Sequence, residues 1–156
     1  MCDVDVVLVP EQAVISLRGP TALAEIGRQM RRLRQLAGLA GLTPAGPMTA
    51  RFYADGGDGA HADYDVCLPV EPRPDGSVPD AIEEARGALL PPHHALRAVH
   101  TGPHDSLHDA WRAVREAAGA RGYTQAGPVT EVYMRGRDAG VPPEEYVTEV
   151  RLPCAR

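Results

Sequence analysis

The sequence predicts an α+β fold in which two tandem strand-helix-strand-strand repeats form a pseudo-twofold single domain around a central groove. Two observations lead to this prediction. Short motifs recur in the same order in both halves of the chain, and each half carries one amphipathic helical stripe between β-branched runs. The chain has 156 residues, of which 44% are hydrophobic and 24% charged. This length and composition are typical of one globular domain and not of a disordered chain.

The internal repeat rests on three landmarks. The nonapeptide GLTPAGPMT, which begins at Gly41, shares six of its nine residues with GYTQAGPVT, which begins at Gly122. A Gly-Pro pair before it and a Leu-Pro pair after it recur at offsets of 83 and 84, beside an offset of 81 for the nonapeptide. This order indicates a duplication, with repeat one at about 3–70, a connection at 71–92 and repeat two at about 93–154.

Repeat one is expected to contain four strands and one helix. Extended, β-branched runs at 4–9 and 13–17 end at a Gly-Pro pair. Two further strands are predicted at 48–54 and 64–68, joined by a glycine-rich loop at 55–62. The helix between these strand pairs is indicated by apolar residues at helical spacing, namely Leu23, Ile26, Met30 and Leu33.

Repeat two follows the same plan. Strands are predicted at 94–101, 129–134 and 146–152, with a turn-rich segment at 136–145. Asp105 is the expected N-cap of the helix, and Gly119 or Gly122 is expected to end it. The helical stripe consists of Leu107, Ala110, Trp111, Val114, Ala117 and Ala118. The proline-rich connection is expected to cross the surface, with a short helix at 81–86.

Several classes of function are excluded by residues that the chain lacks. All 16 basic residues are arginine, so a GxxxxGK[ST] phosphate loop and Schiff-base chemistry are both excluded. None of the three serines lies in a GxSxG motif. The three cysteines, Cys2, Cys67 and Cys154, are far apart and fit reduced thiols.

Charge and hydropathy exclude further partners. A net charge of -5 argues against nucleic acid, because phosphate binding needs a cationic surface. We expect no membrane association, because no apolar run approaches the length of a membrane-spanning helix. The N-terminal residues lack the basic start and apolar core of a secretory signal, so a cytoplasmic location is expected.

Carboxylates on the predicted strands are the main candidates for chemistry. Alternation places Glu131 and Tyr133 on one face of their strand, and by the repeat alignment Glu149 corresponds to Asp65. If the later strands of both repeats meet at the groove, it holds two or three carboxylates among aromatic rings. Such a groove can bind a flat cation, or two carboxylates can acquire different pKa values and act as acid and base. Periodicity alone slightly favours the alternative that Glu131 and Glu149 are exposed strand residues.

Few aromatic residues are available to line a pocket. Trp111 lies on the apolar stripe of the second helix, where such a residue more often packs in a core. Tyr133, its repeat partner Phe52 and the neighbouring Tyr53 either line a pocket or pack the sheet. Tyr64, Tyr123 and Tyr146 are the remaining aromatic candidates. His104 and His108 lie four apart near a helix start but lack a suitable acidic partner, so no metal site is predicted and solvent-facing roles suffice. No cofactor is expected.

The ordered motifs resemble the GyrI-like superfamily, which includes the effector-binding domain attached to some AraC-type and MerR-type regulators. The resemblance rests on the strand, Gly-Pro and Trp111 helix of repeat two, the Glu-Val-Tyr motif at 131–133, and the Thr-Glu-Val-Arg-Leu-Pro motif at 148–153. It extends over nearly the whole chain, including the Val-Pro-Glu-Gln-Ala-Val stretch at 9–14. We therefore expect a stand-alone member without a helix-turn-helix domain.

The resemblance implies paired modules around a groove that binds hydrophobic, often cationic, small molecules through a buried glutamate and aromatic rings. By this resemblance, Glu131 takes the role of the ligand-binding glutamate, and Glu149 does so less directly. Repeat one has Ala50 at the position that Glu131 occupies in repeat two. A binding protein for sequestration or self-protection is ranked first, because it needs only the groove, a carboxylate and rings. The expected ligand is a hydrophobic molecule, aromatic or cationic, and the protein is expected to be a monomer or a homodimer.

Two other functions remain open. Some similar stand-alone proteins hydrolyse the cyclopropane of DNA-alkylating antibiotics. In a hydrolase of this kind, Glu131 or Glu149 would activate water while Trp111 and Tyr133 stack on the substrate. The third possibility is a protein-binding inhibitor of a DNA enzyme. It is ranked last because a net charge of -5 is small for a DNA mimic.

Overall fold

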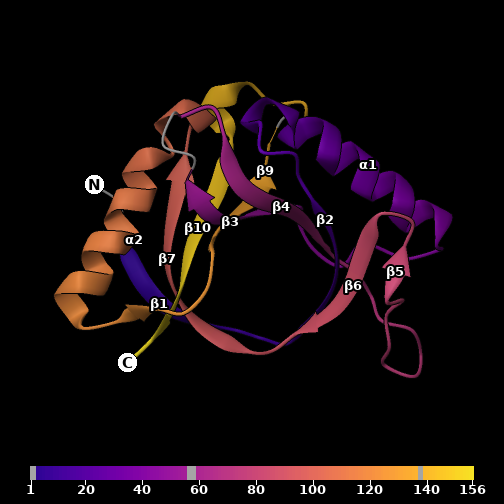
Figure 1. The fold of residues 1–156 in the computed structure, drawn as a ribbon. Coiled ribbons are helices and arrows are strands. Elements are labelled where there is room, and N and C mark those ends of the chain that lie inside the picture. The colour runs from indigo at the N-terminus through magenta and orange to yellow at the C-terminus, as the bar shows by residue number, and fades with distance from the viewer. Residues whose placement is uncertain (1–2, 56–58, 137–138) are drawn as a thin grey trace. The chain divides into compact units, whose positions relative to one another are not determined.

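The computed structural model describes residues 3–55, 59–136 and 139–156. The described residues contain ten strands and two α-helices, so the predicted α+β class is confirmed (Figure 1). The chain divides into two compact units: unit 1 contains residues 1–9 and 93–156, and unit 2 contains residues 10–92. Parts of the loops expected at 55–62 and 136–145 lie outside the described residues, as does Cys2.

Unit 1 is an antiparallel sheet with one helix on it. The strand order is β1 (Val4–Val9), β7 (His93–Thr101), β10 (Val147–Ala155) and β9 (Val129–Arg135), and β8 (Thr124–Gln125) pairs with the end of β10. A 3-10 turn (His104–Ser106) leads into helix α2 (His108–Arg121), and another 3-10 turn (Pro143–Glu145) precedes β10.

Unit 2 is likewise an antiparallel sheet with one α-helix. Its strand order is β3 (Thr49–Asp55), β4 (Ala62–Pro69), β2 (Gln12–Arg18), β6 (Ala85–Leu90) and β5 (Ala81–Ile82), all antiparallel. A 3-10 turn (Leu23–Glu25) leads into helix α1 (Ile26–Leu39). The helices and strands predicted for the two repeats therefore form, with small shifts at their ends.

The first strand does not join the unit that its sequence position suggests. Residues 4–9 were expected to begin repeat one, but β1 pairs with β7 of unit 1, where Val4 lies opposite Ala98 and Val6 opposite Leu96. Val4, Val6 and Leu8 lie on the same face of the sheet as Leu96 and Ala98, and Val4 packs against the unit 1 core. The duplication of the two repeats stays a prediction.

The connection at 71–92 also differs from the prediction, because residues 81–86 form no helix. They begin a hairpin of β5 and β6, whose turn places Glu83 at a φ of 53°. Arg32 of α1 binds Glu84 in this turn, with a distance of 2.9 Å between nitrogen and oxygen. Pairing of β6 along β2 outweighs the local helical pattern, because six residues are too few for a stable helix alone.

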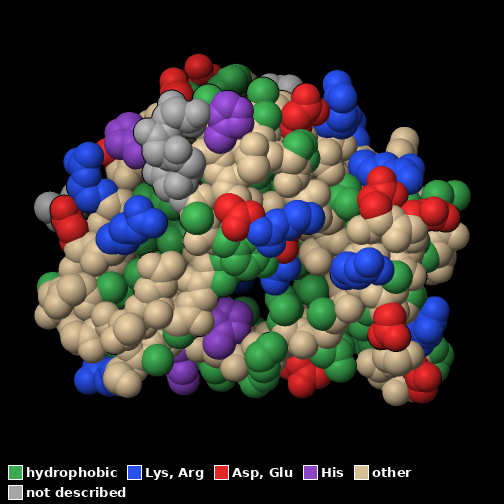
Figure 2. All heavy atoms as spheres, viewed as in Figure 1, with side chains coloured by type: hydrophobic (Ala, Val, Ile, Leu, Met, Phe, Trp, Pro, Cys, Tyr) green, Lys and Arg blue, Asp and Glu red, His purple; other side chains and the backbone are tan. Residues whose placement is uncertain are grey.

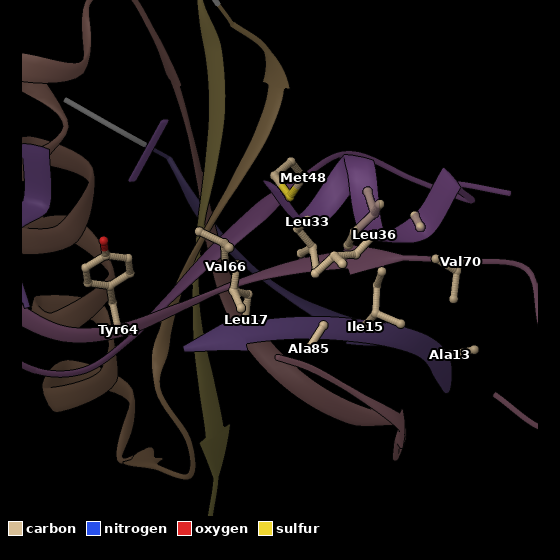
Figure 3. Packing of buried hydrophobic residues seen from close by; sticks show 12 residues of the cluster. Ala13, Ile15, Leu17, Leu33, Leu36, Met48, Tyr64, Val66, Val70 and Ala85 are labelled. Carbon is tan, nitrogen blue, oxygen red and sulfur yellow. The ribbon is translucent and has the colours of Figure 1, made fainter. Parts of the chain in front are cut away.

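Each helix buries one stripe against its own sheet. In unit 2, Leu33 and Leu36 of α1 point toward the sheet, where Ile15 and Leu17 of β2 lie (Figure 3). In unit 1 the stripe of α2 packs on β7 and β10 through Ala110, Val114 and Ala118. The periodicity seen in the sequence therefore identified both buried faces.

The ends of α2 agree with the prediction only in part. Gly122 ends the helix with a φ of 74°, a left-handed conformation that favours glycine. The start is different, because Leu107 occupies the N-cap position and no side chain caps the helix there. Asp105 lies in the preceding 3-10 turn instead.

Arginine and acidic side chains lie side by side at several places on the face shown in Figure 2. No helix among the described residues is long and apolar enough to cross a membrane.

We expect Leu36→Ala to destabilise the protein by about 2–5 kcal/mol, because Leu36 is completely buried and its truncation leaves a cavity. Leu39 ends the same helix but is 76% exposed, so Leu39→Ala is the matched control, expected within about 0.5 kcal/mol of the parent. Urea unfolding measures both values. Equal effects of the two substitutions would contradict the packing of α1.

Candidate functional site

The candidate site lies on the face of the unit 1 sheet that α2 covers. Val150 of β10 packs with Ala110 and Val114 of α2 in one core cluster. Glu131 of β9 is the cross-strand partner of Val150, so its side chain lies on this same face. The Glu131 side chain is thus carried into the core region, and the residue is only 8% exposed.

Two neutral donors hold the Glu131 carboxylate. The indole Nε1–H of Trp111, on α2, donates to Oε2 at 2.7 Å. The hydroxyl of Tyr133, two residues along β9 on the same face, donates to Oε1 at 2.6 Å. Helical spacing directs Trp111 toward the sheet, and strand alternation places Tyr133 beside Glu131. The carboxylate is therefore fixed from both the helix and the strand.

The protonation equilibrium of this group is shifted. Burial raises the pKa of the Glu131 carboxyl, because removal from water penalises the charged form, while the hydrogen bonds from Tyr133 and Trp111 lower it by less. Burial, followed by the nearby Glu131 charge, raises the pKa of the Tyr133 hydroxyl well above its ordinary value. Tyr133 therefore stays a neutral donor at physiological pH.

Aromatic rings adjoin this carboxylate. The ring of His104 lies 5.4 Å from the ring of Tyr133 and 5.1 Å from the ring of Tyr146, both in tilted arrangements. The guanidinium of Arg115 lies 5.1 Å from the Trp111 ring, one helical turn along α2. We name Glu131, Trp111, Tyr133, His104 and Tyr146 the Glu131 cluster. It combines a carboxylate with faces suited to flat or cationic groups.

Glu149 is not part of this cluster, contrary to the expectation of a carboxylate pair in one groove. Its cross-strand partner is Val132, so it projects from the face opposite Glu131. Arg151 binds it with nitrogen–oxygen distances of 2.6 and 3.1 Å. Arg97 adds a contact at 3.5 Å and also binds Asp5 at 2.8 Å. Glu149 is the centre of an ion-pair network.

Asp65 occupies a comparable network in unit 2. Arg51 binds both of its oxygens, at 2.8 and 2.7 Å, and the Tyr53 hydroxyl donates to it at 2.9 Å. The guanidinium of Arg18 lies 4.9 Å from the centre of the Tyr53 ring. Burial raises the pKa of Tyr53 to about 12. The pKa of Arg51 is also raised. Burial is the largest single effect and acts against this, but the hydrogen bond to Asp65 and the charges of Cys67, Asp65 and Tyr53 together outweigh it.

Phe52 and Tyr53 lie on different sides of the unit 2 sheet. Phe52 packs on Tyr64 at 6.2 Å and belongs to the edge of the α1-covered core. Tyr53 falls where the β3–β4 register shifts, and it reaches Asp65 on the other face. The two residues therefore do not line one surface together.

Two members of the Glu131 cluster were not assigned to the site from the sequence: His104, and Tyr146, which was only one of the remaining aromatic candidates for a pocket. His104 was assigned a solvent-facing role, and although it is exposed, it contacts two tyrosine rings. Tyr146 was predicted to begin a strand, but it precedes β10 and follows a 3-10 turn. No periodic signal reports such loop contacts, and only their aromatic character marked these residues. Among the described residues, no three His, Cys, Asp or Glu side chains gather as a metal site.

The family model of the GyrI-like small molecule binding domain matches residues 3–155. The chain belongs to the GyrI-like family. The resemblance noted in the sequence is thereby confirmed, and the protein is a small-molecule binding domain of this type. No match was found among curated proteins.

Solved structures support the same fold. The C-terminal domain of EcmrR has a TM-score of 0.87 and 20% identity, covering 100% of this GyrI-like chain and 99% of that one. EcmrR in a DNA complex has a TM-score of 0.88 and 19% identity, covering 99% of this chain, which spans 58% of that longer protein.

Two further neighbours are more distant. A hydrolase encoded by lin2189 from Listeria innocua has a TM-score of 0.73 and 13% identity, covering 97% of this chain and 91% of that one. SAV2435 bound to tetraphenylphosphonium has a TM-score of 0.63 and 14% identity, covering 98% and 94%. At these identities the likeness is one of fold.

Glu131→Gln is expected to raise the unfolding temperature at pH 7, by about 2–4 °C for each kcal/mol gained. The folded-state pKa of Glu131 is raised above the ordinary 4.5, so ionisation costs stability as pH rises through the folded pKa. Below about pH 4.5 the carboxyl is protonated in both states, and the advantage of the amide should disappear. Thermal unfolding from pH 4 to 8 measures this, with exposed Glu116→Gln on α2 as control. An advantage that is independent of pH would contradict the shift.

Proposed function

We propose that this GyrI-like domain binds hydrophobic cations at the Glu131 cluster and sequesters them. The proposal rests on a difference between Glu131 and the other two buried carboxylates in the described part of the chain, Asp65 and Glu149. Among the described residues, arginine neutralises the buried carboxylates of Asp65 and Glu149, but Glu131 has only the neutral donors Trp111 and Tyr133. A buried charge without an opposite charge is costly, and a bound cation would supply the missing partner.

The surroundings of Glu131 favour an organic cation over a small hydrated one. Indole, phenol and imidazole rings offer apolar area and electron-rich faces to a delocalised positive charge. The hydrogen bonds to the carboxylate hold it in place before a ligand arrives, which reduces the ordering cost of binding. The net charge of -5 also favours the approach of cations. The structure of SAV2435 with tetraphenylphosphonium supports this class of ligand for the fold.

In a cell, such binding would lower the free concentration of toxic hydrophobic cations. Sequestration or self-protection is therefore the role proposed for the domain.

The test uses tetraphenylphosphonium and its anionic counterpart of similar shape, tetraphenylborate. Calorimetry should detect binding of the cation by the parent protein and no binding of the anion. Glu131→Gln should weaken cation binding by about 10- to 100-fold, the range of a hydrogen-bonded charged contact. Glu116→Gln removes an exposed charge from α2 and should leave the affinity within about twofold. Equal binding of the cation and the anion, or an unchanged affinity of Glu131→Gln for tetraphenylphosphonium, would contradict the proposal.

A hydrolase is the second candidate, favoured by the raised pKa of Glu131 and its contact with Tyr133. In this reaction Glu131 takes a proton from water, and the water oxygen bonds to a cyclopropane carbon. The ring C–C bond breaks, its electron pair moves onto a conjugated carbonyl, and a proton returned from Glu131 neutralises that oxygen. Tyr133 keeps the carboxylate oriented. The similar fold of the Listeria innocua hydrolase is consistent with this chemistry.

Mass spectrometry of a cyclopropane-bearing alkylating antibiotic, incubated with catalytic amounts of protein, tests the reaction. A hydrolase adds one water to many equivalents of compound, and Glu131→Gln abolishes the addition. Tyr133→Phe, which removes one hydrogen bond, should slow it by about 10-fold or more. Glu149→Gln should retain turnover, because Glu149 projects from the other face. An unchanged antibiotic leaves binding as the function.

A further inference from the structure

Two buried polar atoms of unit 1 have no hydrogen-bond partner among the described residues. They are Nδ1 of His100 on β7 and Oγ1 of Thr148 on β10. His100 is 8% exposed and Thr148 is completely buried. Buried polar groups are nearly always paired, because an unpaired one loses its hydrogen bonds to water without replacement. Two such atoms in one unit therefore require an explanation.

The two residues are direct neighbours. Thr148 is the cross-strand partner of His100 on one side and of Tyr133 on the other. These three residues form one row across the sheet. The next row on the same face contains Ala98, Val150 and Glu131. Both unpaired atoms thus belong to the α2-covered face, one row from the Glu131 carboxylate.

The hydrogen bonds of His100 indicate what its unpaired nitrogen needs. Its Nε2 lies 2.8 Å from the hydroxyl of Ser106, and that hydroxyl donates to the carbonyl of Pro103 at 3.0 Å. Since the Ser106 proton is engaged, Nε2 carries the ring proton and donates to Ser106, which leaves Nδ1 as an acceptor. The same assignment argues against Ser106 as an activated nucleophile, because an activated serine donates to histidine.

The partner that fits both atoms is a hydroxyl oxygen. It donates a proton to Nδ1 of His100 and accepts one from Thr148, so it satisfies both residues at once. A carbonyl oxygen cannot donate to Nδ1. An ammonium group can donate to both atoms, but it leaves the Thr148 proton without an acceptor, whereas a hydroxyl oxygen satisfies both partners.

We propose that His100 and Thr148 form a hydroxyl-binding subsite beside the Glu131 cluster, bridged by the oxygen of a water molecule or of a ligand hydroxyl. The subsite gives the α2-covered face a neutral hydrogen-bonding contact in addition to its carboxylate. The binding of a ligand hydroxyl at this subsite rests on the proposed binding function, whereas a bridging water does not depend on it. Hydrophobic cations that carry a well-placed hydroxyl are then preferred over those without one.

The first experiment replaces Thr148 by valine in the ligand-free protein. Valine has the same shape but no hydroxyl, so the sign of the change in unfolding temperature is informative. If water bridges Thr148 to His100, Thr148→Val lowers that temperature by about 2–4 °C. Thr49→Val is the reference, because the buried Thr49 hydroxyl donates to the Cys67 carbonyl at 3.0 Å and its loss also destabilises.

A double-mutant cycle with His100→Phe distinguishes the loss of a bridge between the two residues from a general packing effect of either substitution. Under the proposal, Thr148→Val lowers the unfolding temperature in the parent but has little effect once His100 is replaced, because the bridge is already lost. Additive effects of the two substitutions overturn a bridge in the ligand-free protein.

The second experiment separates a ligand hydroxyl from water. Tetraphenylphosphonium is compared with its ortho-, meta- and para-hydroxylated derivatives on one ring. At least one isomer should bind the parent about 5-fold more tightly, and this preference should vanish in Thr148→Val while tetraphenylphosphonium itself binds unchanged. If Thr148→Val raises the unfolding temperature and no isomer is preferred, the subsite does not exist. Failure of every phosphonium to bind refutes the proposed function instead, and the ligand-free result still decides the subsite.

Discussion

The proposed function depends on one feature: the buried carboxylate of Glu131 has no arginine partner among the described residues. Glu131 lies under α2 and keeps its place through one indole and one phenol donor. Neutral donors orient a carboxylate without cancelling its charge, so the attraction for a cation is preserved. The position of α2 matters for the same reason, because it carries Trp111 to one oxygen while β9 brings Tyr133 to the other. The packing of α2 on the sheet therefore also sets the geometry of the hydrogen bonds to Glu131.

Strand alternation keeps the arginines of β7 and β10 away from Glu131. Arg97 and Arg151 are cross-strand partners on the face opposite α2, where both bind Glu149. For either guanidinium to reach Glu131, its strand would have to slip by one residue, which would also turn Leu96 and Leu152 out of the core. The ion-pair network on one face and the unneutralised carboxylate on the other are therefore set by the same register.

Local periodicity accounts for what the sequence analysis predicted correctly. The stripes on both helices, and the shared face of Glu131 and Tyr133, depend only on residues near one another in the chain. The failures involve distant pairing. That Glu149 faces away from Glu131 depends on the β9–β10 register, which includes a shift between Val147 and Thr148. The pairing of residues 4–9 with β7 and the hairpin at 81–90 likewise depend on partners far along the chain, which patterns in one strand do not reveal.

The comparable position in unit 2 bears on the charge of the ligand under the proposed function. The repeat alignment matches Glu131 with Ala50, which lies opposite Val66 on the α1-covered face and is completely buried. Its neighbours on that face, Phe52 and Tyr64, pack into the core. Asp65, a buried carboxylate on the neighbouring strand β4, projects from the other face and is neutralised by Arg51. The described part of unit 2 therefore offers apolar contacts under its helix and no second unneutralised carboxylate there. Under the proposed function, such a cluster would select one positive charge with an apolar body, because a second charge on the same ligand would lose its water without gaining a partner.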